Sequence, residues 1–261
     1  MLLEVNGHAV YATSGGRRPG RARETVLFVH GSGQDHSIWA LPARRFASHD
    51  RNVLAVDLPG HGRSGGAPLQ SIEAIADWLV AVLDAAGRER AAIAGHSLGS
   101  LAALAAAARH PGRVRAIALV GTAWPMAVSP ALLAAARENL PSAIDMLTRW
   151  GFHNAGAGQT PASINPLQEA GRRLLERARP GVIHTDLKAC NDYAAGLEHA
   201  AAVNCPALLI LGEHDRLTPP RAARQLAAAL PNAETIILEG AGHAMLAERP
   251  ALVLEHLTRV L

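Results

Sequence analysis

The chain has 261 residues and a mass of 27.3 kDa, which is enough for one α/β domain with a buried core and a modest insertion. Hydrophobic residues make up 49% of the chain and charged residues 18%, a globular balance that excludes a disordered or fibrous protein. The formal net charge is +3, but the basic residues are scattered and aromatic residues make up only 3%. Nucleic-acid binders concentrate basic charge on one face, so we expect no nucleic-acid partner.

Neither the N-terminal residues nor the cysteines indicate export or a membrane. The N-terminal residues lack the basic and apolar regions of a signal peptide, and the longest apolar run, residues 101–108, is about ten residues short of a membrane span. The two cysteines, Cys190 and Cys205, are too few for a disulfide framework. We therefore expect a soluble cytoplasmic protein with no membrane partner.

Short apolar runs, each bounded by Gly, Pro, Asp or His, predict the strands of a sheet. The chain opens with a predicted hairpin, residues 2–5 and 9–13, around the turn Asn6-Gly7. Further strands are expected at residues 25–30, 53–57, 91–95, 116–121, 207–212 and 235–239. These runs are apolar without clean alternation, which is typical of parallel strands that are covered on both faces.

Helical patterns separate these strands. Residues 71–86 place apolar side chains, such as Ile72, Ile75 and Leu79, on one face of a helix. Other helices are expected at residues 97–109, 220–230 and 245–260. Alternating strands and helices predict the α/β class, with a mostly parallel sheet that is flanked by helices.

The alternation breaks between Trp124 and about Ala202, where no good strand is found. Helical stretches are expected there at residues 130–139, 142–150, 166–177 and 186–200, with a glycine-containing loop at residues 154–158. We interpret this region as a helical insertion between two strands. The predicted organisation is a core in two parts, residues 1–123 and 203–261, interrupted by the insertion at residues 124–202.

The motif Gly95-His96-Ser97-Leu98-Gly99 lies between a predicted strand and a predicted helix. A serine in such a G-x-S-x-G motif sits on a tight turn that lifts its hydroxyl out of the sheet, beside the positive end of the helix. Large side chains two positions away on either side would clash in that turn. Ser97 is therefore the candidate nucleophile, whereas His96 is expected to support the turn.

A serine hydroxyl is a poor nucleophile unless a base takes its proton. His243, which lies among glycines in the loop after the last predicted strand, is the candidate base. Asp215 comes just after the strand at residues 207–212 and is our choice for the acid that orients the imidazole, with Glu213 as its competitor. The order Ser97, Asp215, His243 is the order of nucleophile, acid and base in this architecture.

Two backbone N–H groups are candidates for an oxyanion hole. The glycine-rich turn at residues 30–33 follows a predicted strand and can direct N–H groups toward a point near Ser97. We expect the N–H groups of Ser32 and Leu98 to bind the oxyanion, where each such donor contributes about 3–4 kcal/mol to the transition state.

Five motifs, in the same order, resemble those of the α/β-hydrolase superfamily, in particular its cap-bearing bacterial serine esterases. They occupy residues 30–33, 57–64, 95–99, 212–219 and 240–243, and together they span nearly the whole chain. The resemblance implies the α/β-hydrolase fold with an eight-stranded sheet, a Ser-Asp-His triad, no metal and no organic cofactor. It also implies that the insertion is a helical cap over the substrate pocket. Haloalkane dehalogenases and epoxide hydrolases of this fold place an aspartate where this chain has Ser97, which argues against both.

The predicted function is hydrolysis of a small-molecule carboxylic ester of small to medium acyl size, a carboxylesterase-like activity that forms an acyl-enzyme. The same triad would also serve a thioester, a lactone or a C–C bond, and these alternatives stay open. An alternative of another class is a non-catalytic ligand-binding protein on the hydrolase scaffold. Candidate substrate-binding side chains in the insertion are Trp124, Met126, Trp150, Phe152 and Tyr193. The expected oligomeric state is a monomer or a homodimer.

Overall fold

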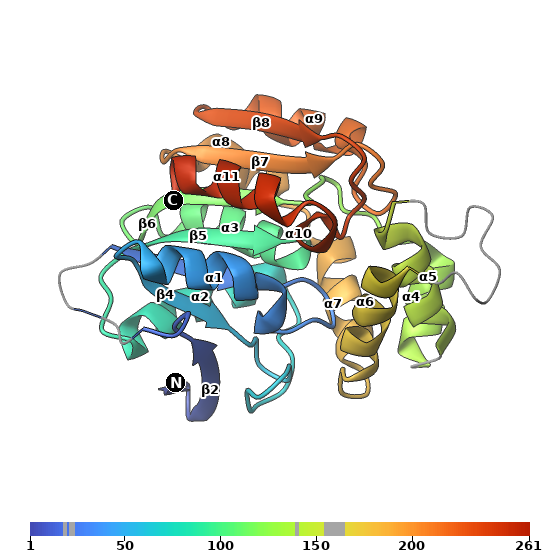
Figure 1. The fold of residues 1–261 in the computed structure, drawn as a ribbon, viewed down its shortest axis with the longest axis horizontal. Helices are drawn as coiled ribbons and strands as arrows, with labels where there is room; N and C mark the ends of the chain where they lie inside the picture. Colours follow the sequence, from blue (N-terminus) through green and yellow to red (C-terminus); the bar gives the residue numbers. More distant parts are fainter. Residues whose placement is uncertain (18–19, 21–23, 139–140, 154–164) are drawn as a thin grey trace.

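The computed structural model describes residues 1–17, 20, 24–138, 141–153 and 165–261, and Figure 1 shows one sheet with helices on both faces. Eight strands pair in the order β1-β2-β4-β3-β5-β6-β7-β8 among these residues. β1 and β2 pair antiparallel with their neighbours, and the remaining pairs are parallel. The predicted mostly parallel α/β sheet is therefore confirmed. The strands are β1 (Leu2–Val5), β2 (His8–Thr13), β3 (Thr25–Val29), β4 (Asn52–Val56), β5 (Ala91–His96), β6 (Val114–Val120), β7 (Ala207–Gly212) and β8 (Ala233–Leu238).

The strands form where the sequence predicts them because the chain supplies turns and apolar runs at those points. Asn6 and Gly7 have φ angles of 51° and 78°, the positive values that a two-residue hairpin turn between β1 and β2 requires. β3, β4 and β5 are buried along their full length. This burial follows from the helices that cover both faces of the sheet.

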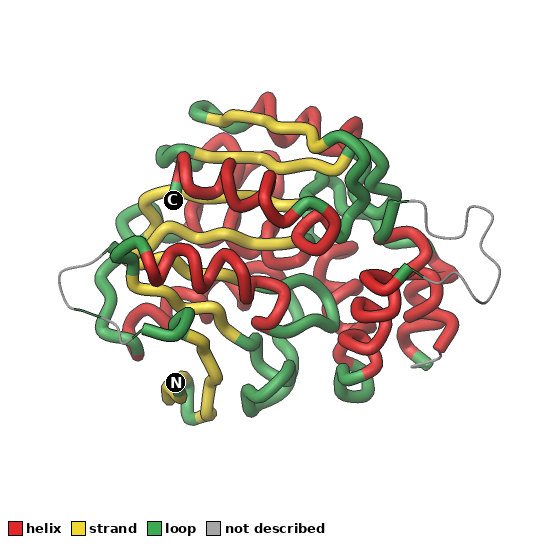
Figure 2. Tube along the Cα trace, in the orientation of Figure 1, coloured by secondary structure: helices red, strands yellow, loops and turns green. Residues whose placement is uncertain are grey.

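Two layers of helices cover the sheet, one on each face, as Figure 2 shows. On one face, α1 (Ala40–Ser48) and α11 (Pro250–Val260) contact each other over an apolar core that includes Trp39 and Phe46. The other layer rests on a second core and holds the helix that follows the candidate nucleophile. Its helices are α2 (Ile72–Ala85), α3 (Leu98–Arg109), α8 (Gly196–Ala202) and α9 (Pro220–Ala229).

α2 illustrates how the sequence specifies one of these helices. Ser71 caps its first turn, since Ser71 Oγ accepts a hydrogen bond from the Ala74 N–H at 3.1 Å. Ile72, Ile75 and Leu79 are buried on one face of the helix, as their spacing predicts. The cap fixes where the helix begins, and the apolar face fixes which side packs on the sheet.

Between β6 and β7 the chain leaves the sheet and forms helices beside the carboxyl ends of the strands (Figure 1). The first four helices of this insertion pack on one another around Leu132, Leu175 and Leu187. α8, the last helix of the predicted insertion, instead packs against α3 and α9 of the layer that covers the sheet. The first four are α4 (Pro130–Arg137), α5 (Pro141–Gly151), α6 (Pro166–Glu176) and α7 (Val182–Asp192).

The single helix predicted at residues 186–200 is wrong. α7 ends at Asp192 and α8 begins at Gly196, because Tyr193 takes an extended backbone with φ −69° and ψ 105°. Tyr193 is buried, so this break directs the ring inward. A helical pattern in sequence does not reveal such a break when the residues around it are themselves good helix formers.

The single helix predicted at residues 245–260 is also divided, into α10 (Met245–Glu248) and α11. Pro250 lacks an N–H for the helical ladder and excludes helical backbone at the preceding Arg249, which has φ −135°.

The 3-10 helix η1 (His36–Trp39) and α1 were not predicted. The predicted loop at residues 154–158 lies outside the described residues. Within the described ranges, none of the helices combines the length and apolarity needed to cross a membrane.

Candidate active site

The turn between β5 and α3 holds Ser97 in a backbone conformation that side chains rarely adopt. Its φ is 53° and its ψ is −119°. A residue held in such a region stores about 1–3 kcal/mol of strain, and residues of this kind concentrate at active sites. The turn places Ser97 at the end of β5 and at the amino end of α3.

Two glycines make this tight turn possible. A Cβ atom on Gly95 would lie 1.9 Å from the carbonyl oxygen of Gly99. A Cβ atom on Gly99 would lie 2.5 Å from the carbonyl oxygen of Val29 in the neighbouring strand. Both contacts are with backbone atoms that cannot move aside, so only glycine fits at either position. The spacing of the G-x-S-x-G motif thus follows from the packing of the turn.

Asp215 follows β7 and His243 follows β8, and their side chains meet. His243 Nδ1 lies 2.8 Å from Asp215 Oδ2. The Thr218 hydroxyl donates to the same carboxylate oxygen at 2.6 Å, and the Thr218 N–H donates to Asp215 Oδ1 at 2.8 Å. Burial opposes ionisation of Asp215, but His243 and the hydrogen bonds outweigh it, so the Asp215 pKa lies below its usual value. An ionised Asp215 can keep a proton on His243 Nδ1 and leave Nε2 as a base.

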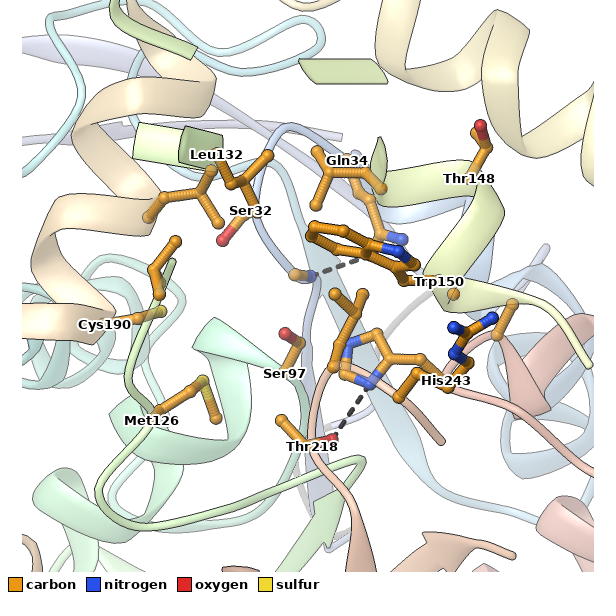
Figure 3. A pocket seen from close by; sticks show the side chains of 18 of the residues that line it. Ser32, Gln34, Ser97, Met126, Leu132, Thr148, Trp150, Cys190, Thr218 and His243 are labelled. Carbon is orange, nitrogen blue, oxygen red and sulfur yellow. Dashed lines mark hydrogen bonds between the residues drawn. The ribbon is translucent and has the colours of Figure 1, made fainter. Parts of the chain in front are cut away.

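Ser97 and His243 line one cavity (Figure 3). In the part of the chain that the structure describes, no hydrogen bond of the Ser97 hydroxyl is found, so its hydrogen bond to His243 Nε2 has to form before proton transfer. Glu213, the competing acid, is exposed and accepts a hydrogen bond from the Gly240 N–H at 2.9 Å. The structure therefore brings Asp215, and not Glu213, to the imidazole.

Two backbone N–H groups were predicted to form the oxyanion hole, those of Ser32 and Leu98. Neither the Ser32 nor the Leu98 N–H donates a hydrogen bond to another described residue. Leu98 is the first residue of α3, where N–H groups are unpaired and the helix dipole is positive. A Cβ atom on Gly31 would lie 3.1 Å from Ser97 Cβ, so the turn that carries Ser32 lies against Ser97. Both donors are available to a ligand oxygen at this point.

The cavity at Ser97 has a volume of about 240 Å³ and lies between the sheet and the insertion helices. Three of the predicted substrate-binding residues, Met126, Trp150 and Phe152, line it. Most of the remaining described lining is apolar, and Arg216 is its only Asp, Glu, Lys or Arg residue. A lining of this kind suits an apolar substrate group that is held by few polar contacts.

Trp124 and Tyr193, which were also predicted to contact substrate, are absent from the described cavity lining. Trp124 packs against Gly196, where a Cβ atom would lie 2.0 Å from the indole ring. The Tyr193 ring is 4% exposed, and its hydroxyl lies 2.6 Å from His199 Nδ1. Tyr193 belongs to the large apolar core and Trp124 packs against it. Their contact with substrate stays a prediction.

Thr218 and Gln34 also line the cavity, and neither was predicted to have a role there. Thr218 lies three residues after Asp215 inside a recognised motif, and a hydroxyl at that spacing from an aspartate could have signalled the contact. Gln34 Oε1 accepts a hydrogen bond from the Gly31 N–H at 3.0 Å, and no motif in the sequence indicated this contact.

His96 supports the turn next to Ser97, as predicted from its position. Its Nε2 donates to the His243 carbonyl oxygen at 2.9 Å. Burial together with His243 lowers the pKa of His96 to about 3.

One group of described residues offers ligand atoms for a cation. Atoms of Asp35, His36 and Asp57 lie within 4.8 Å of one another. Asp57 Oδ1, however, accepts from the His36 N–H at 2.8 Å and lies 2.7 Å from His36 Nδ1, and Oδ2 accepts from the Arg63 N–H at 2.9 Å. These internal hydrogen bonds explain the cluster without an ion.

The sheet order and the strained serine turn after β5 define the α/β-hydrolase class of proteins. A family model described as the alpha/beta hydrolase fold matches residues 24–250. The chain belongs to the α/β-hydrolase family, and it is a hydrolase.

Individual proteins of this family are also similar to this chain. The chain is 33% identical over 229 residues to the pimeloyl-(acyl-carrier protein) methyl ester esterase of Chromobacterium violaceum, a match that covers 84% of this chain and 87% of that protein. It is 30% identical over 249 residues to the protein of the same name from Klebsiella pneumoniae, with 89% and 91% covered. Among solved structures, the enol-lactonase from Burkholderia xenovorans matches with a TM-score of 0.86 and 25% identity, covering 100% of this chain and 99% of that one.

Proposed function

We propose that this chain is a serine hydrolase that cleaves carboxylic esters of small to medium acyl substrates, with Ser97, His243 and Asp215 as its triad. One observation carries most of the support: the hydrogen-bonded His243–Asp215 pair, at 2.8 Å, and the strained Ser97 turn meet at a single cavity. A base oriented in this way removes the proton that makes a serine hydroxyl a poor nucleophile.

In the proposed reaction, His243 Nε2 takes the Ser97 proton as Ser97 Oγ attacks the acyl carbon. The carbonyl electron pair moves onto oxygen, and the N–H groups of Ser32 and Leu98 stabilise that negative charge. When the intermediate collapses, the bond to the alcohol oxygen breaks and His243 gives its proton to the leaving group. Water then repeats these steps on the acyl-enzyme, which releases the carboxylic acid and restores Ser97, while Asp215 stays ionised.

The proposed substrate is a small-molecule ester with an apolar acyl group, because the described lining of the cavity is mostly apolar and its volume is about 240 Å³. The similar proteins include esterases of a pimeloyl-(acyl-carrier protein) methyl ester and an enol-lactonase. A lactone, which is a cyclic ester, is therefore the second candidate. Thioesters and C–C bonds are further alternatives for the same triad.

We also propose that residues 124–202 form a cap on a core made of residues 1–123 and 203–261. Leu132 of α4, Leu147 of α5, Leu175 of α6 and Leu187 of α7 line the cavity wall opposite the sheet, which supports this role. α8 would then attach the cap to the core through α3 and α9. All the proposed catalytic groups come from one chain, so either a monomer or a homodimer would be active.

The direct test is Ser97→Ala. We predict that it lowers kcat for hydrolysis of a chromogenic short-chain ester, such as p-nitrophenyl butyrate, by at least about 1,000-fold. Ser129→Ala is the matched control, because Ser129 also lines the cavity but its hydroxyl caps α4 at the Leu132 N–H. Circular dichroism would show that both variants are folded. Retained turnover in Ser97→Ala would exclude the mechanism.

The alternative to a hydrolase is a ligand-binding protein without catalytic activity, and the two can be distinguished by the reactivity of Ser97. A fluorophosphonate probe labels only an activated serine and leaves a covalent adduct at its oxygen. Stoichiometric labelling at Ser97, located by mass spectrometry, supports the hydrolase. Folded wild-type protein that takes up no label would favour the binding protein.

A further inference from the structure

A buried ion pair joins the insertion to the core next to the proposed oxyanion hole. Asp186 lies on α7, and His61 lies in the turn that follows β4. Asp186 Oδ2 and His61 Nε2 are 2.8 Å apart, and both side chains are only 2% exposed. Burying two charges is costly unless further hydrogen bonds accompany the pair, so their surroundings indicate what the pair does.

The same carboxylate oxygen also holds the loop that carries Ser32. Asp186 Oδ2 accepts a hydrogen bond from the Gly33 N–H at 2.8 Å, and Gly33 directly follows Ser32. Gly33 has a φ of +67°, and a Cβ atom there would lie 2.6 Å from Ile183 Cγ1 of the same helix. The loop therefore packs closely against α7, and the hydrogen bond from the Gly33 N–H to Asp186 holds it there.

The hydrogen bonds of His61 require its charged form. Its Nδ1 lies 2.9 Å from the Pro59 carbonyl oxygen, and its Nε2 faces the Asp186 carboxylate. Carbonyl and carboxylate oxygens only accept, so both ring nitrogens must donate, which a neutral imidazole cannot do. Burial opposes that charge, but Asp186 outweighs it, and the pKa of His61 is raised.

The neighbouring His30 is held in the neutral form. Its ring centroid lies 4.8 Å from that of His61. His30 Nδ1 donates to the Gly31 carbonyl oxygen at 2.9 Å, and His30 Nε2 accepts from the Leu58 N–H at 3.1 Å, which a charged imidazole could not do. Asp186 Oδ2 therefore faces the charged His61 on one side and the Gly33 N–H on the other.

We propose that Asp186 is a positioning residue for the reaction, which fixes the Ser32 N–H at the oxyanion through its hydrogen bond to the adjacent Gly33 N–H. This inference rests on the proposed function. His61 holds the carboxylate in place toward the loop, and α7 brings Asp186 to the core. The oxyanion hole is then complete only when the insertion is seated on the core, because the residue that fixes the loop belongs to the insertion.

The test is Asp186→Asn, which keeps the shape of the side chain but removes its charge, together with Asp186→Ala. We expect kcat for p-nitrophenyl butyrate to fall about 10-fold in Asp186→Asn and about 100-fold in Asp186→Ala, with KM little changed, because a misplaced donor weakens the transition state more than the bound substrate. Thermal unfolding would establish that each variant is folded.

Two inhibitors can distinguish a misplaced Ser32 N–H from a general loss of rigidity in the Asp186 variants. A trifluoromethyl ketone adds to Ser97 and places an oxyanion in the hole, whereas the matching methyl ketone binds without forming one. We expect the trifluoromethyl ketone to lose most of its advantage over the methyl ketone in the Asp186 variants. Unchanged kcat and unchanged inhibitor discrimination in folded Asp186→Asn and Asp186→Ala would overturn the inference.

Arg179→Gln is the matched control for the contact between insertion and core. Arg179 donates to the Ser64 carbonyl oxygen at 3.0 Å and to the Gly62 carbonyl oxygen at 3.4 Å, in the turn that holds His61. Among the described residues, its side chain makes no hydrogen bond to the loop that carries Ser32. We expect near wild-type kcat in this variant. An equal loss in Arg179→Gln would show that Asp186 only seats the insertion. Wild-type protein with no ester hydrolysis and no adduct at Ser97 would instead overturn the proposed function itself.

Discussion

At the scale of single residues, Thr218 shows how one hydroxyl group can tune the acid of the proposed triad. Its Oγ1 donates to Asp215 Oδ2 at 2.6 Å and lies 3.0 Å from His243 Nδ1. We predict that Thr218→Val lowers kcat of ester hydrolysis about tenfold, since a hydrogen bond to a charged group contributes about 1.5–3 kcal/mol. The variant should also raise the Asp215 pKa from its lowered value, because the carboxylate loses a donor. Steady-state kinetics at neutral pH measures the effect on kcat.

Thr218→Ser is the control for this substitution. Serine keeps the hydroxyl and removes only a methyl group, so we expect near wild-type kcat. A loss as large as that of Thr218→Val would mean that the methyl group, through packing beside Asp215, is what matters.

Some residues of the candidate site can be predicted from the sequence more easily than others. Ser97, Asp215 and His243 each lie just after a predicted strand, and parallel strands bring their carboxyl ends to one edge of the sheet. Their convergence therefore follows from the topology. Trp124 and Tyr193 were placed in the pocket only because they are large and lie in the insertion. The direction of a side chain in the insertion depends on packing against the core, and no local pattern encodes that packing.

At the scale of elements, the turn between β5 and α3 depends on the absence of a side chain at Gly95. We predict that Gly95→Ala destabilises the protein by more than about 3 kcal/mol or prevents folding, because the new Cβ would lie 1.9 Å from the Gly99 carbonyl oxygen. Urea unfolding followed by circular dichroism measures the change in the free energy of unfolding.

Gly112→Ala is the matched control, since a Cβ atom there meets nothing within 4 Å. We expect it to change the free energy of unfolding by less than about 1 kcal/mol, with a gain arising from the reduced entropy of the unfolded chain. Similar stability in the two variants would contradict the view that close packing, and not loop flexibility, requires Gly95.

The elements themselves were predictable where one strong signal dominates. β3, β4 and β5 are apolar runs buried on both faces, and the first hairpin turns at Asn6-Gly7. α1 was missed, because it is short, contains Pro42 and follows a loop. The breaks at Tyr193 and before Pro250 were also missed, since residues on both sides favour a helix. Tertiary burial of the Tyr193 ring decides the first break, and proline geometry decides the second.

At the scale of the whole molecule, buried histidines near the active-site loops link folding to pH in opposite directions. Burial and the charge of His61 lower the pKa of His30 to about 4, and burial and His243 lower the pKa of His96 to about 3. The pKa of His61 is raised, because Asp186 outweighs the effect of burial. The folded protein therefore excludes protons at two of these sites and retains one at the third.

We predict that the free energy of unfolding is largest near pH 6.5, the ordinary histidine pKa. Below about pH 6.5 the unfolded chain binds protons at His30 and His96, whereas the folded protein binds them only near pH 4 at His30 and near pH 3 at His96. The free energy of unfolding therefore decreases as the pH is lowered below about 6.5. The slope approaches about 1.4 kcal/mol per pH unit for each histidine. The contribution of His61 is fully present below about pH 6.5 and is lost as pH rises through its raised pKa. Urea unfolding between about pH 4.5 and 8.5 measures both limbs.

Asp186→Asn separates the two limbs of this profile. The alkaline decline should disappear, because His61 loses the charge that raises its pKa, whereas the acid decline should remain, because it arises mainly from burial of His30 and His96. A flat wild-type profile below pH 6.5 would mean that the folded protein protonates His30 as readily as the unfolded chain does. That result would require the hydrogen bond from the Leu58 N–H to His30 Nε2, at 3.1 Å, to break at no cost.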